Sequence, residues 1–207
     1  MNGNKYILIS GCTGVGKSTL AELLHKELAY KLLTDPFEEN PYIEDAYMDF
    51  KAWAFHSQLF FLSQFAKLHK RLDRETDNIL QERSIYECFH IFLKQFYLEG
   101  NVSTRDYRLF EDLYKTLAGN VQRKPDLILY LNAPSEIILS RVRQRGRGFE
   151  NTITKEFIDK QDLRYQEWLP TVGRDIRILK IDTAELNYLN NPVDLEYIMN
   201  EISCERT

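Results

Sequence analysis

The segment from Gly11 to Ser18 matches the pattern G-x-x-x-x-G-K-[ST]. It follows the apolar run 6–9, which predicts a short buried strand, and it precedes leucines at helical spacing over 20–28. A strand, a glycine-rich turn and a helix in this order predict a loop whose backbone N–H groups surround a polyphosphate. In such a loop Lys17 would reach the β- and γ-phosphates, and the Ser18 hydroxyl would bind Mg²⁺. We therefore expect a nucleoside triphosphate on Gly11, Cys12, Thr13, Gly14, Val15, Gly16, Lys17, Ser18 and Thr19.

The composition is that of a globular protein. A chain of 207 residues with 43% hydrophobic and 28% charged residues is expected to form one domain, 1–207, with a full core. The net charge of −4 argues against a broad nucleic-acid surface. No apolar run has membrane-spanning length, and the N-terminal residues lack a signal-peptide pattern. The charge and the absence of such a run lead us to expect no nucleic-acid or membrane partner. Because Cys12, Cys88 and Cys204 are few and scattered, we expect reduced thiols and a cytoplasmic location.

Short apolar runs alternate with helical patterns along the whole chain. This alternation predicts an α/β fold with a parallel sheet of about five strands covered by helices on both faces. The expected strands are 5–10, 31–34, 78–82, 126–131 and 176–181, and the expected helices are 42–71, 85–98, 104–121, 134–144, 154–170 and 192–203. The sequence contains neither an N-K-x-D guanine motif nor a D-x-x-G switch, so a P-loop kinase fold is favoured over a GTPase.

Four arginines occur within seven residues, at positions 141, 143, 145 and 147. Their mutual repulsion indicates either a solvated helix face or a surface that meets a polyanion. In a chain with a triphosphate site, we favour a lid whose arginines neutralise the transferred phosphoryl group. Gly146 and Gly148 would allow such a lid to hinge.

Two acidic segments follow predicted strands, where ligands of open α/β sheets collect. The pair Glu82-Arg83 could hold Mg²⁺ through the carboxylate and a substrate oxygen through the guanidinium, or it could be a structural ion pair. Asp35 could accept a proton from a substrate hydroxyl, as the base of a kinase does. Helix capping is the alternative for Asp35, and the local sequence alone favours it.

Taken together, these segments resemble the deoxynucleoside kinase family, particularly the bacterial deoxyadenosine and deoxyguanosine kinases. The similarity extends in order over most of the first 150 residues, in the segments 11–18, 35–42, 47–58, 82–86, 125–131 and 141–150. It implies transfer of the γ-phosphoryl group of ATP to the 5′-hydroxyl of a deoxynucleoside, with Mg²⁺ as cofactor, in nucleotide salvage. Family members usually form homodimers through their long early helices, and the Phe-rich stretch 53–68 is either such a face or core.

The resemblance also implies roles for individual residues. Asp35 takes the position of the general base, where the family normally has a glutamate, and Glu38 and Glu82 are alternatives. Because aspartate is one methylene shorter, its oxygen lies farther from the hydroxyl or acts through a water. The expected catalytic set is Asp35, Arg83, Lys17, Arg141, Arg145 and Arg147, with Ser18 and Glu82 at the metal. Arg145 and Asp182 are expected beside ATP, Asp182 within the loop that borders its adenine.

The acceptor site follows from the same resemblance. Tyr47 and Glu150 would bind the sugar 3′-hydroxyl, and the Gln58 amide would pair with the base. Phe92 would stack on that base, while Trp53 and Phe55 would line the pocket, with plain core as the alternative. Relatives that take deoxyadenosine or deoxycytidine usually have an arginine and an aspartate where this chain has Phe65 and Cys88. The expected substrate-binding set is Asp35, Tyr47, Trp53, Phe55, Gln58, Arg83, Cys88, Phe92 and Glu150, and the preferred base stays open.

Two other functions compete with this interpretation. A thymidylate kinase-like nucleoside monophosphate kinase would need cations around the substrate phosphate, whereas the segment after Asp35 carries acids. A nucleotide-binding regulator would use the loop for switching, without a small-molecule acceptor. Labelled transfer from ATP to deoxynucleosides distinguishes the three.

Overall fold

The computed structural model describes residues 4–72, 74–121 and 123–204. Its centre is a five-stranded, wholly parallel sheet in the order β2-β3-β1-β4-β5. The strands are β1 (Tyr6–Gly11), β2 (Lys31–Leu33), β3 (Ile79–Glu82), β4 (Leu127–Asn132) and β5 (Arg177–Asp182). The predicted fold class is therefore confirmed, and each strand lies within one residue of its expected bounds.

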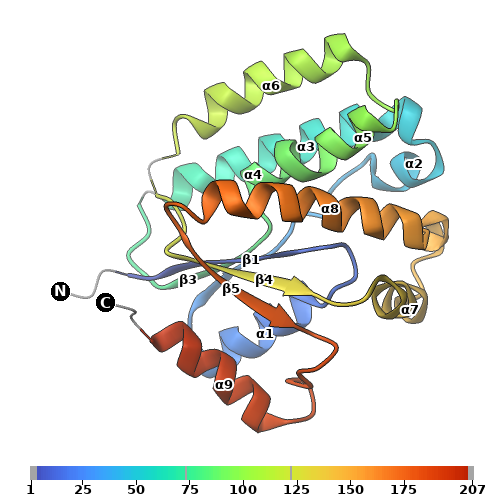
Figure 1. The fold of residues 1–207 in the computed structure, drawn as a ribbon. Helices are drawn as coiled ribbons and strands as arrows, with labels where there is room; N and C mark the ends of the chain where they lie inside the picture. The colour runs from blue at the N-terminus through green and yellow to red at the C-terminus, as the bar shows by residue number, and fades with distance from the viewer. Residues whose placement is uncertain (1–3, 73, 122, 205–207) are drawn as a thin grey trace.

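Helices cover the sheet on both faces (Figure 1). On one face lie α1 (Lys17–Leu28) and α9 (Pro192–Ser203); on the other lie α3 (Phe50–Leu72), α4 (Ile85–Glu87), α5 (Lys94–Leu98) and α8 (Lys155–Val172). The helix α6 (Thr104–Ala118) lies outside α3, and α7 (Ser135–Arg145) follows β4. Because both faces are covered, β1, β3 and most of β4 are fully buried, which explains their continuous apolar runs.

Two predicted helices differ from the structure in detail. The expected helix 42–71 is divided at Asp49 into α2 (Ile43–Met48) and α3, because Asp49 has non-helical backbone angles (φ −148°, ψ 90°) and its carboxylate accepts from the Ala52 N–H. The expected helix 85–98 is continuous, but its centre is a π-helical stretch, η1 (Cys88–Leu93). Such stretches are frequent at functional sites, and this one follows directly after β3 and α4.

The carboxyl ends of the strands meet at one edge of the sheet. Gly11 ends β1, Asp35 follows β2 by two residues, Glu82 ends β3, and Asp182 ends β5. The short helix η2 (Gly148–Thr152) follows α7 at this same edge (Figure 1). Among the helices in the described ranges, none combines the length and apolar character needed to cross a bilayer.

Candidate active site

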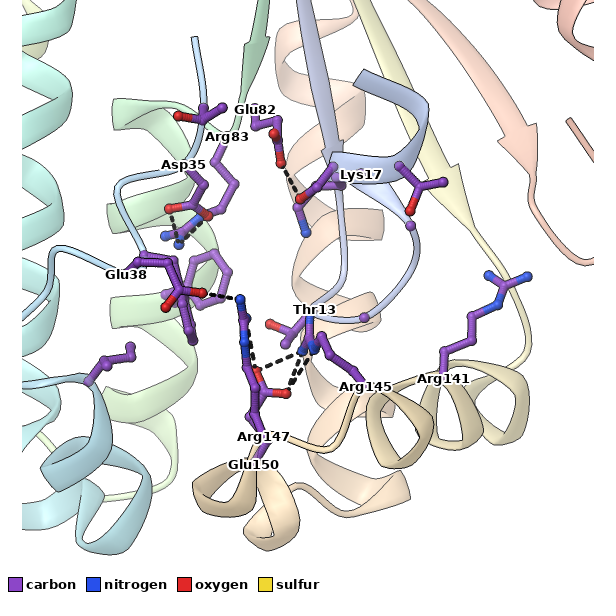
Figure 2. A pocket seen from close by; sticks show the side chains of 18 of the residues that line it. Thr13, Lys17, Asp35, Glu38, Glu82, Arg83, Arg141, Arg145, Arg147 and Glu150 are labelled. Carbon is purple, nitrogen blue, oxygen red and sulfur yellow. Dashed lines mark hydrogen bonds and ion pairs between the residues drawn. The ribbon is translucent and has the colours of Figure 1, made fainter. Parts of the chain in front are cut away.

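A cavity of about 940 Å³ opens at this edge, which is within the usual size of ligand sites. Its lining includes the glycine-rich loop with Lys17 and Ser18, the acidic segment after β2 with Arg83, and an aromatic end with Gln58. The lid arginines and the segment after β5 complete it. Figure 2 shows Asp35 and Arg83 on one side of the cavity and Lys17 on the other, with Arg145, Arg147 and Glu150 gathered at the lid.

The glycine-rich loop has the backbone that a phosphate site requires. Gly14 and Gly16 have φ angles of 85° and 109°, in the left-handed region that favours glycine. Lys17 Nζ donates to the carbonyls of Gly11 and Cys12, at 2.8 and 3.0 Å. Thr13, Gly14, Gly16, Lys17, Ser18 and Thr19 line the cavity. Of the other predicted residues here, Gly11 belongs to β1, and Cys12 and Val15 are buried behind the loop, so they contribute backbone only.

Ser18 and Glu82 form an oxygen-rich pair beside the loop. The Ser18 hydroxyl donates to Glu82 Oε2 at 2.6 Å, and Glu82 is almost fully buried. Burial raises the pKa of Glu82, while the Ser18 hydrogen bond and Lys17 oppose that rise. Mg²⁺ in kinases is typically held by one or two protein oxygens together with substrate phosphates. This pair fits that requirement, although the described residues contain no cluster of three or more His, Cys, Asp or Glu side chains that could hold a metal unaided.

Asp35 and Arg83 face each other across the ends of β2 and β3. Arg83 Nη1 donates to Asp35 Oδ2 at 3.1 Å, and the arginine side chain is 5% exposed. Burial alone would lower the pKa of Arg83, but the carboxylate of Asp35 raises it above its ordinary value. Arg83 also has a left-handed backbone (φ 55°), which is uncommon outside glycine and clusters at active sites. The capping alternative for Asp35 is not what the structure shows, since its recorded hydrogen bonds are to Arg83.

The aromatic residues near Arg83 do more than fill the core. The Arg83 guanidinium lies 4.1 Å from the ring centre of Phe92, 4.5 Å from that of Phe61 and 5.7 Å from that of Phe65. Phe92 and Phe61 also line the cavity. Stacking of this kind fixes the guanidinium plane and leaves its edge available to ligands. Cation–π packing on Phe61 and Phe65 was not predicted from the sequence.

The lid arginines have different partners. Arg145 donates to both carboxylate oxygens of Glu150, at 2.6 to 3.0 Å, and Glu150 is 1% exposed. Arg147 pairs with Glu38 across the cavity and lies 4.5 Å from the Phe37 ring centre. Both arginines line the cavity, so the lid is in contact with the segment after β2 (Figure 2).

Arg141 and Arg143 donate to other protein groups in this structure. Arg141 donates to the hydroxyl and carbonyl of Thr183, both at 2.7 Å, and to the carbonyl of Val15 at 3.2 Å. It thereby ties α7 to the loop after β5, and it lies apart from the other lid arginines in Figure 2. Arg143 donates to backbone carbonyls of Glu150 and Ile153. Arg141 also lines the cavity, so these contacts hold its side chain at the site, and its catalytic role stays a prediction.

The aromatic end of the cavity contains one amide. Gln58 is 4% exposed, and its Oε1 has no hydrogen-bond partner among the residues described. Around it the lining is mostly apolar: Ile43, Ala46, Phe50, Ala54, Phe61, Phe92, Phe96 and Phe157. Tyr47 lines the cavity, with its ring centre 5.6 Å from that of Phe50 and 5.5 Å from that of Phe149; burial, and then the charge of Glu150, raise the pKa of its hydroxyl. A planar ligand with a polar edge would satisfy the Gln58 amide.

Several predicted site residues lie outside the cavity lining. Trp53 stacks on Tyr42 with ring centres 5.9 Å apart, and Phe55 meets the edge of Phe110 at 6.2 Å. Cys88 is fully buried, with a pKa raised by burial to about 12. Asp182 accepts from the N–H groups of Ala184 and Glu185, so it shapes the turn rather than contacting the cavity. None of these four contributes to the lining formed by the described residues, which instead includes 183–184 and 186–189 after β5.

Some residues that support the site were not expected. Gln161 of α8 accepts from the Thr13 N–H at 2.6 Å, and Tyr165, one turn later, donates to the carbonyl of Gly11. Both are fully buried. The sequence signal for these two residues was their spacing: Gln161 and Tyr165 are polar residues four positions apart on the buried face of α8. That spacing does not indicate which groups they bind.

The fold and the site together define a P-loop phosphotransferase with a second, nucleoside-sized compartment. A sequence model described as "Deoxynucleoside kinase" matches residues 7–205, and the chain belongs to that family. It is 33% identical to a deoxyadenosine/deoxycytidine kinase of Bacillus subtilis over 97% of this chain and 92% of the relative. It is 30% identical to a deoxyadenosine kinase of Dictyostelium discoideum, over 97% of this chain and 78% of that protein.

A solved structure agrees with these relatives. A deoxyadenosine kinase from M. mycoides, with the products dCMP and a flexible dCDP bound, superimposes with a TM-score of 0.84. The two are 31% identical, and the match covers 96% of this chain and 98% of that one. The family suggested by the sequence motifs is thus confirmed.

Proposed function

We propose that this protein transfers the γ-phosphoryl group of ATP to the 5′-hydroxyl of a deoxynucleoside. The observation that carries the proposal is the single cavity with two unlike ends. The glycine-rich loop lines one end, the Gln58 amide, whose Oε1 has no partner among the residues described, lines the other, and the Asp35–Arg83 pair lies between them. Such a cavity has room for a triphosphate and a neutral nucleoside in line.

The proposed chemistry is an in-line displacement. Asp35 accepts the proton of the 5′-hydroxyl, the 5′-oxygen forms a bond to the γ-phosphorus, and the bond to the β-bridging oxygen breaks, releasing ADP. Arg83 orients Asp35 and holds the 5′-oxygen. Bound Mg²⁺, held through Ser18 and Glu82, would neutralise phosphate charge. Lys17, Arg145 and Arg147 supply the other positive charges around the moving group.

We further propose that the acceptor is deoxyadenosine or deoxycytidine rather than deoxyguanosine. The Gln58 amide offers one donor and one acceptor, which match the amino group and ring nitrogen of adenine or cytosine. Guanine would also place its N2 amino group at this apolar end, without an acceptor, at a cost of about 1–3 kcal/mol. The names of the Bacillus deoxyadenosine/deoxycytidine kinase and the Dictyostelium deoxyadenosine kinase support the same choice, whereas Phe65 and Cys88 depart from the residues usual in such relatives, so the choice rests on Gln58. Tyr47 and Glu150 would receive the 3′-hydroxyl.

The alternative functions have less support. A monophosphate kinase needs free cations beside the acceptor, but Arg83, Arg145 and Arg147 already face carboxylates. A regulator without an acceptor has no use for an unpartnered amide at the far end of the cavity. The test is an acceptor panel with labelled ATP, comparing the four deoxynucleosides with dTMP. Labelled deoxynucleoside 5′-monophosphates are expected; label transferred only to dTMP, or only to inorganic phosphate, would reject the proposal.

The assembly and location are also proposals. We propose one cytoplasmic domain, 1–207, that forms a homodimer through α3 and α6. The Phe-rich stretch 53–68 is largely turned inward, since Phe61 and Phe65 are buried, but α6 exposes Leu109 and Leu113 on its outer side. Sedimentation at several protein concentrations tests the dimer. Replacing Leu109 and Leu113 with serine is expected to give monomers.

A further inference from the structure

A carboxylate with no part in the chemistry above lies behind the phosphate-binding loop. Glu87, the last residue of α4, is fully buried. Its Oε1 lies within hydrogen-bond distance of the hydroxyls of Ser10 (2.7 Å) and Tyr165 (2.8 Å), and its Oε2 lies 3.1 Å from the Ser84 hydroxyl. Three hydroxyls from β1, α8 and the β3–α4 turn thus converge on one buried acid, and a buried acid needs every one of its hydrogen bonds supplied.

The Tyr165 hydroxyl has two acceptors and a single proton. It lies 2.8 Å from Glu87 Oε1 and 3.0 Å from the carbonyl oxygen of Gly11. If Glu87 is ionised, its Oε1 and the Gly11 carbonyl oxygen can both accept but neither can donate. The single proton of the Tyr165 hydroxyl can then serve only one of the two contacts. If Glu87 is the neutral acid, its own O–H donates to Tyr165 and Tyr165 donates to Gly11. The neutral form therefore supplies a proton to each contact.

The Gly11 carbonyl accepts from a second donor, Lys17, which phosphate binding would draw away. Lys17 Nζ lies 2.8 Å from the same carbonyl. When that ammonium turns toward the phosphates of a bound nucleotide, the Gly11 carbonyl keeps only the Tyr165 hydroxyl among the contacts described. A buried carbonyl without a donor is costly, so the Tyr165 hydrogen bond should hold the start of the loop in place at that moment.

We propose that Glu87 is a positioning residue that acts as a neutral acid, fixing the phosphate-binding loop through Tyr165 and the carbonyl of Gly11. The inference rests on the proposed function only in requiring that this loop bind ATP. Burial raises the pKa of Glu87 and so favours the neutral acid; the charge of Arg83, the hydrogen bonds from Ser10 and Tyr165, and the charge of Lys17 favour the anion but do not cancel that rise. The other titratable groups that act on it are Tyr165, Tyr6 and Cys88.

The sign of the pH dependence follows from that raised pKa. The neutral acid is fully present below the pKa of Glu87 in the folded protein and is lost as the pH rises through it. Nucleotide affinity should therefore weaken toward alkaline pH. Deoxynucleoside affinity should not follow this change, because Glu87 lies behind the loop and is absent from the cavity lining in the described chain.

Three variants test the proposal: Glu87→Gln, Glu87→Ala and Tyr165→Phe. The dissociation constant of a non-hydrolysable ATP analogue with Mg²⁺ is measured by calorimetry over a range of pH, with thermal unfolding as a check of folding. The amide of Glu87→Gln can still donate to Tyr165, so this variant should bind like the wild type at low pH and lose the alkaline weakening. Tyr165→Phe and Glu87→Ala should each bind about tenfold more weakly, and the double variant no more weakly than either.

Each outcome decides the proposal. Glu87→Gln binding as poorly as Glu87→Ala would show that the anion is needed and would overturn it. Unchanged nucleotide affinity in Tyr165→Phe would overturn it as well, and this variant serves if Glu87→Ala does not fold. If the wild-type protein binds no ATP analogue, the proposed function is rejected. If it binds the analogue normally but transfers no phosphoryl group to a nucleoside, the proposed function is rejected, while the Glu87 proposal can still be tested by nucleotide binding.

Discussion

The two ends of the cavity are built in opposite ways. At the phosphate end, charged and polar groups are held by other protein groups: Lys17 on two carbonyls, Ser18 on Glu82, and Asp35 on Arg83. At the far end, aromatic and aliphatic side chains surround Gln58, whose Oε1 has no partner in the described residues.

This difference separates catalysis from recognition. Charge that develops during phosphoryl transfer is stabilised best by groups already fixed in place, whereas selection of a base needs shape and an unsatisfied polar edge. Changes at the phosphate end should therefore lower kcat, and changes at the aromatic end should alter KM and the ranking of bases. The following substitutions test that division.

The largest effect is expected from Lys17→Ala. Removal of the ammonium beside the phosphates should lower kcat by roughly 10⁴-fold, because no other group replaces its charge. Steady-state transfer assays measure this loss. Lys26→Ala, an exposed lysine on the same helix, is the matched control and should retain activity. Near-normal turnover of the Lys17→Ala protein would contradict the claim that the phosphate end of the cavity determines kcat.

Asp35→Asn should lower kcat by roughly 10³-fold and leave the dissociation constant of the deoxynucleoside almost unchanged. The amide keeps the shape of the side chain but no longer accepts the proton of the 5′-hydroxyl. Single-turnover kinetics and equilibrium binding separate the two effects, with Glu39→Gln, an exposed acid of the same segment, as control. A loss confined to binding would remove Asp35 from the chemistry.

Gln58→Leu should lower kcat/KM for the preferred deoxynucleoside by about 30-fold, mostly through KM, because the base loses its polar partner. Gln58→Glu should raise deoxyguanosine relative to the other bases, since a carboxylate suits its N–H donors. Competition assays with mixed deoxynucleosides measure the ranking. Gln64→Leu lies on the same helix and should change neither value; an unaltered ranking in Gln58→Glu would place Gln58 outside the base site.

Of the cations assigned to the moving group, Arg147 should contribute least: Arg147→Ala should lower kcat by about threefold, because water screens the charge of this partly exposed side chain. Its pair with Glu38 is partly exposed, and such ion pairs contribute little in water. Arg145→Ala should cost clearly more, because it leaves the buried carboxylate of Glu150 with fewer partners. Parallel kinetics of the two variants provide the measurement, and equal losses would contradict the different roles assigned to them.

The sequence predicted the fold and the polar end more fully than the aromatic end. The strands and the loop from Gly11 to Ser18 depend on local patterns, so they could be predicted closely. The break at Asp49 was missed because a single capping aspartate is weak against a long apolar pattern. Trp53 and Phe55 lie outside the cavity lining, which the sequence could not indicate because helical spacing does not say which side of a helix faces a cavity; that depends on tertiary packing.

The supporting residues could not be predicted for a related reason. Glu87 and Tyr165 are 78 residues apart in sequence, and only the packing of α8 behind β1 brings them together. Arg141 likewise resembles the other lid arginines in sequence, yet its partners, Thr183 and Val15, come from distant segments. Long-range partners of this kind leave no periodic signal.

The most direct measurement is a crystal structure of the protein with a non-hydrolysable ATP analogue and deoxyadenosine. The 5′-oxygen should lie within hydrogen-bond distance of Asp35, in line with the γ-phosphate on the glycine-rich loop, and the base edge should meet Gln58. A cavity that admits the triphosphate but excludes the nucleoside, or a nucleoside bound with its 5′-oxygen away from Asp35, would contradict the account.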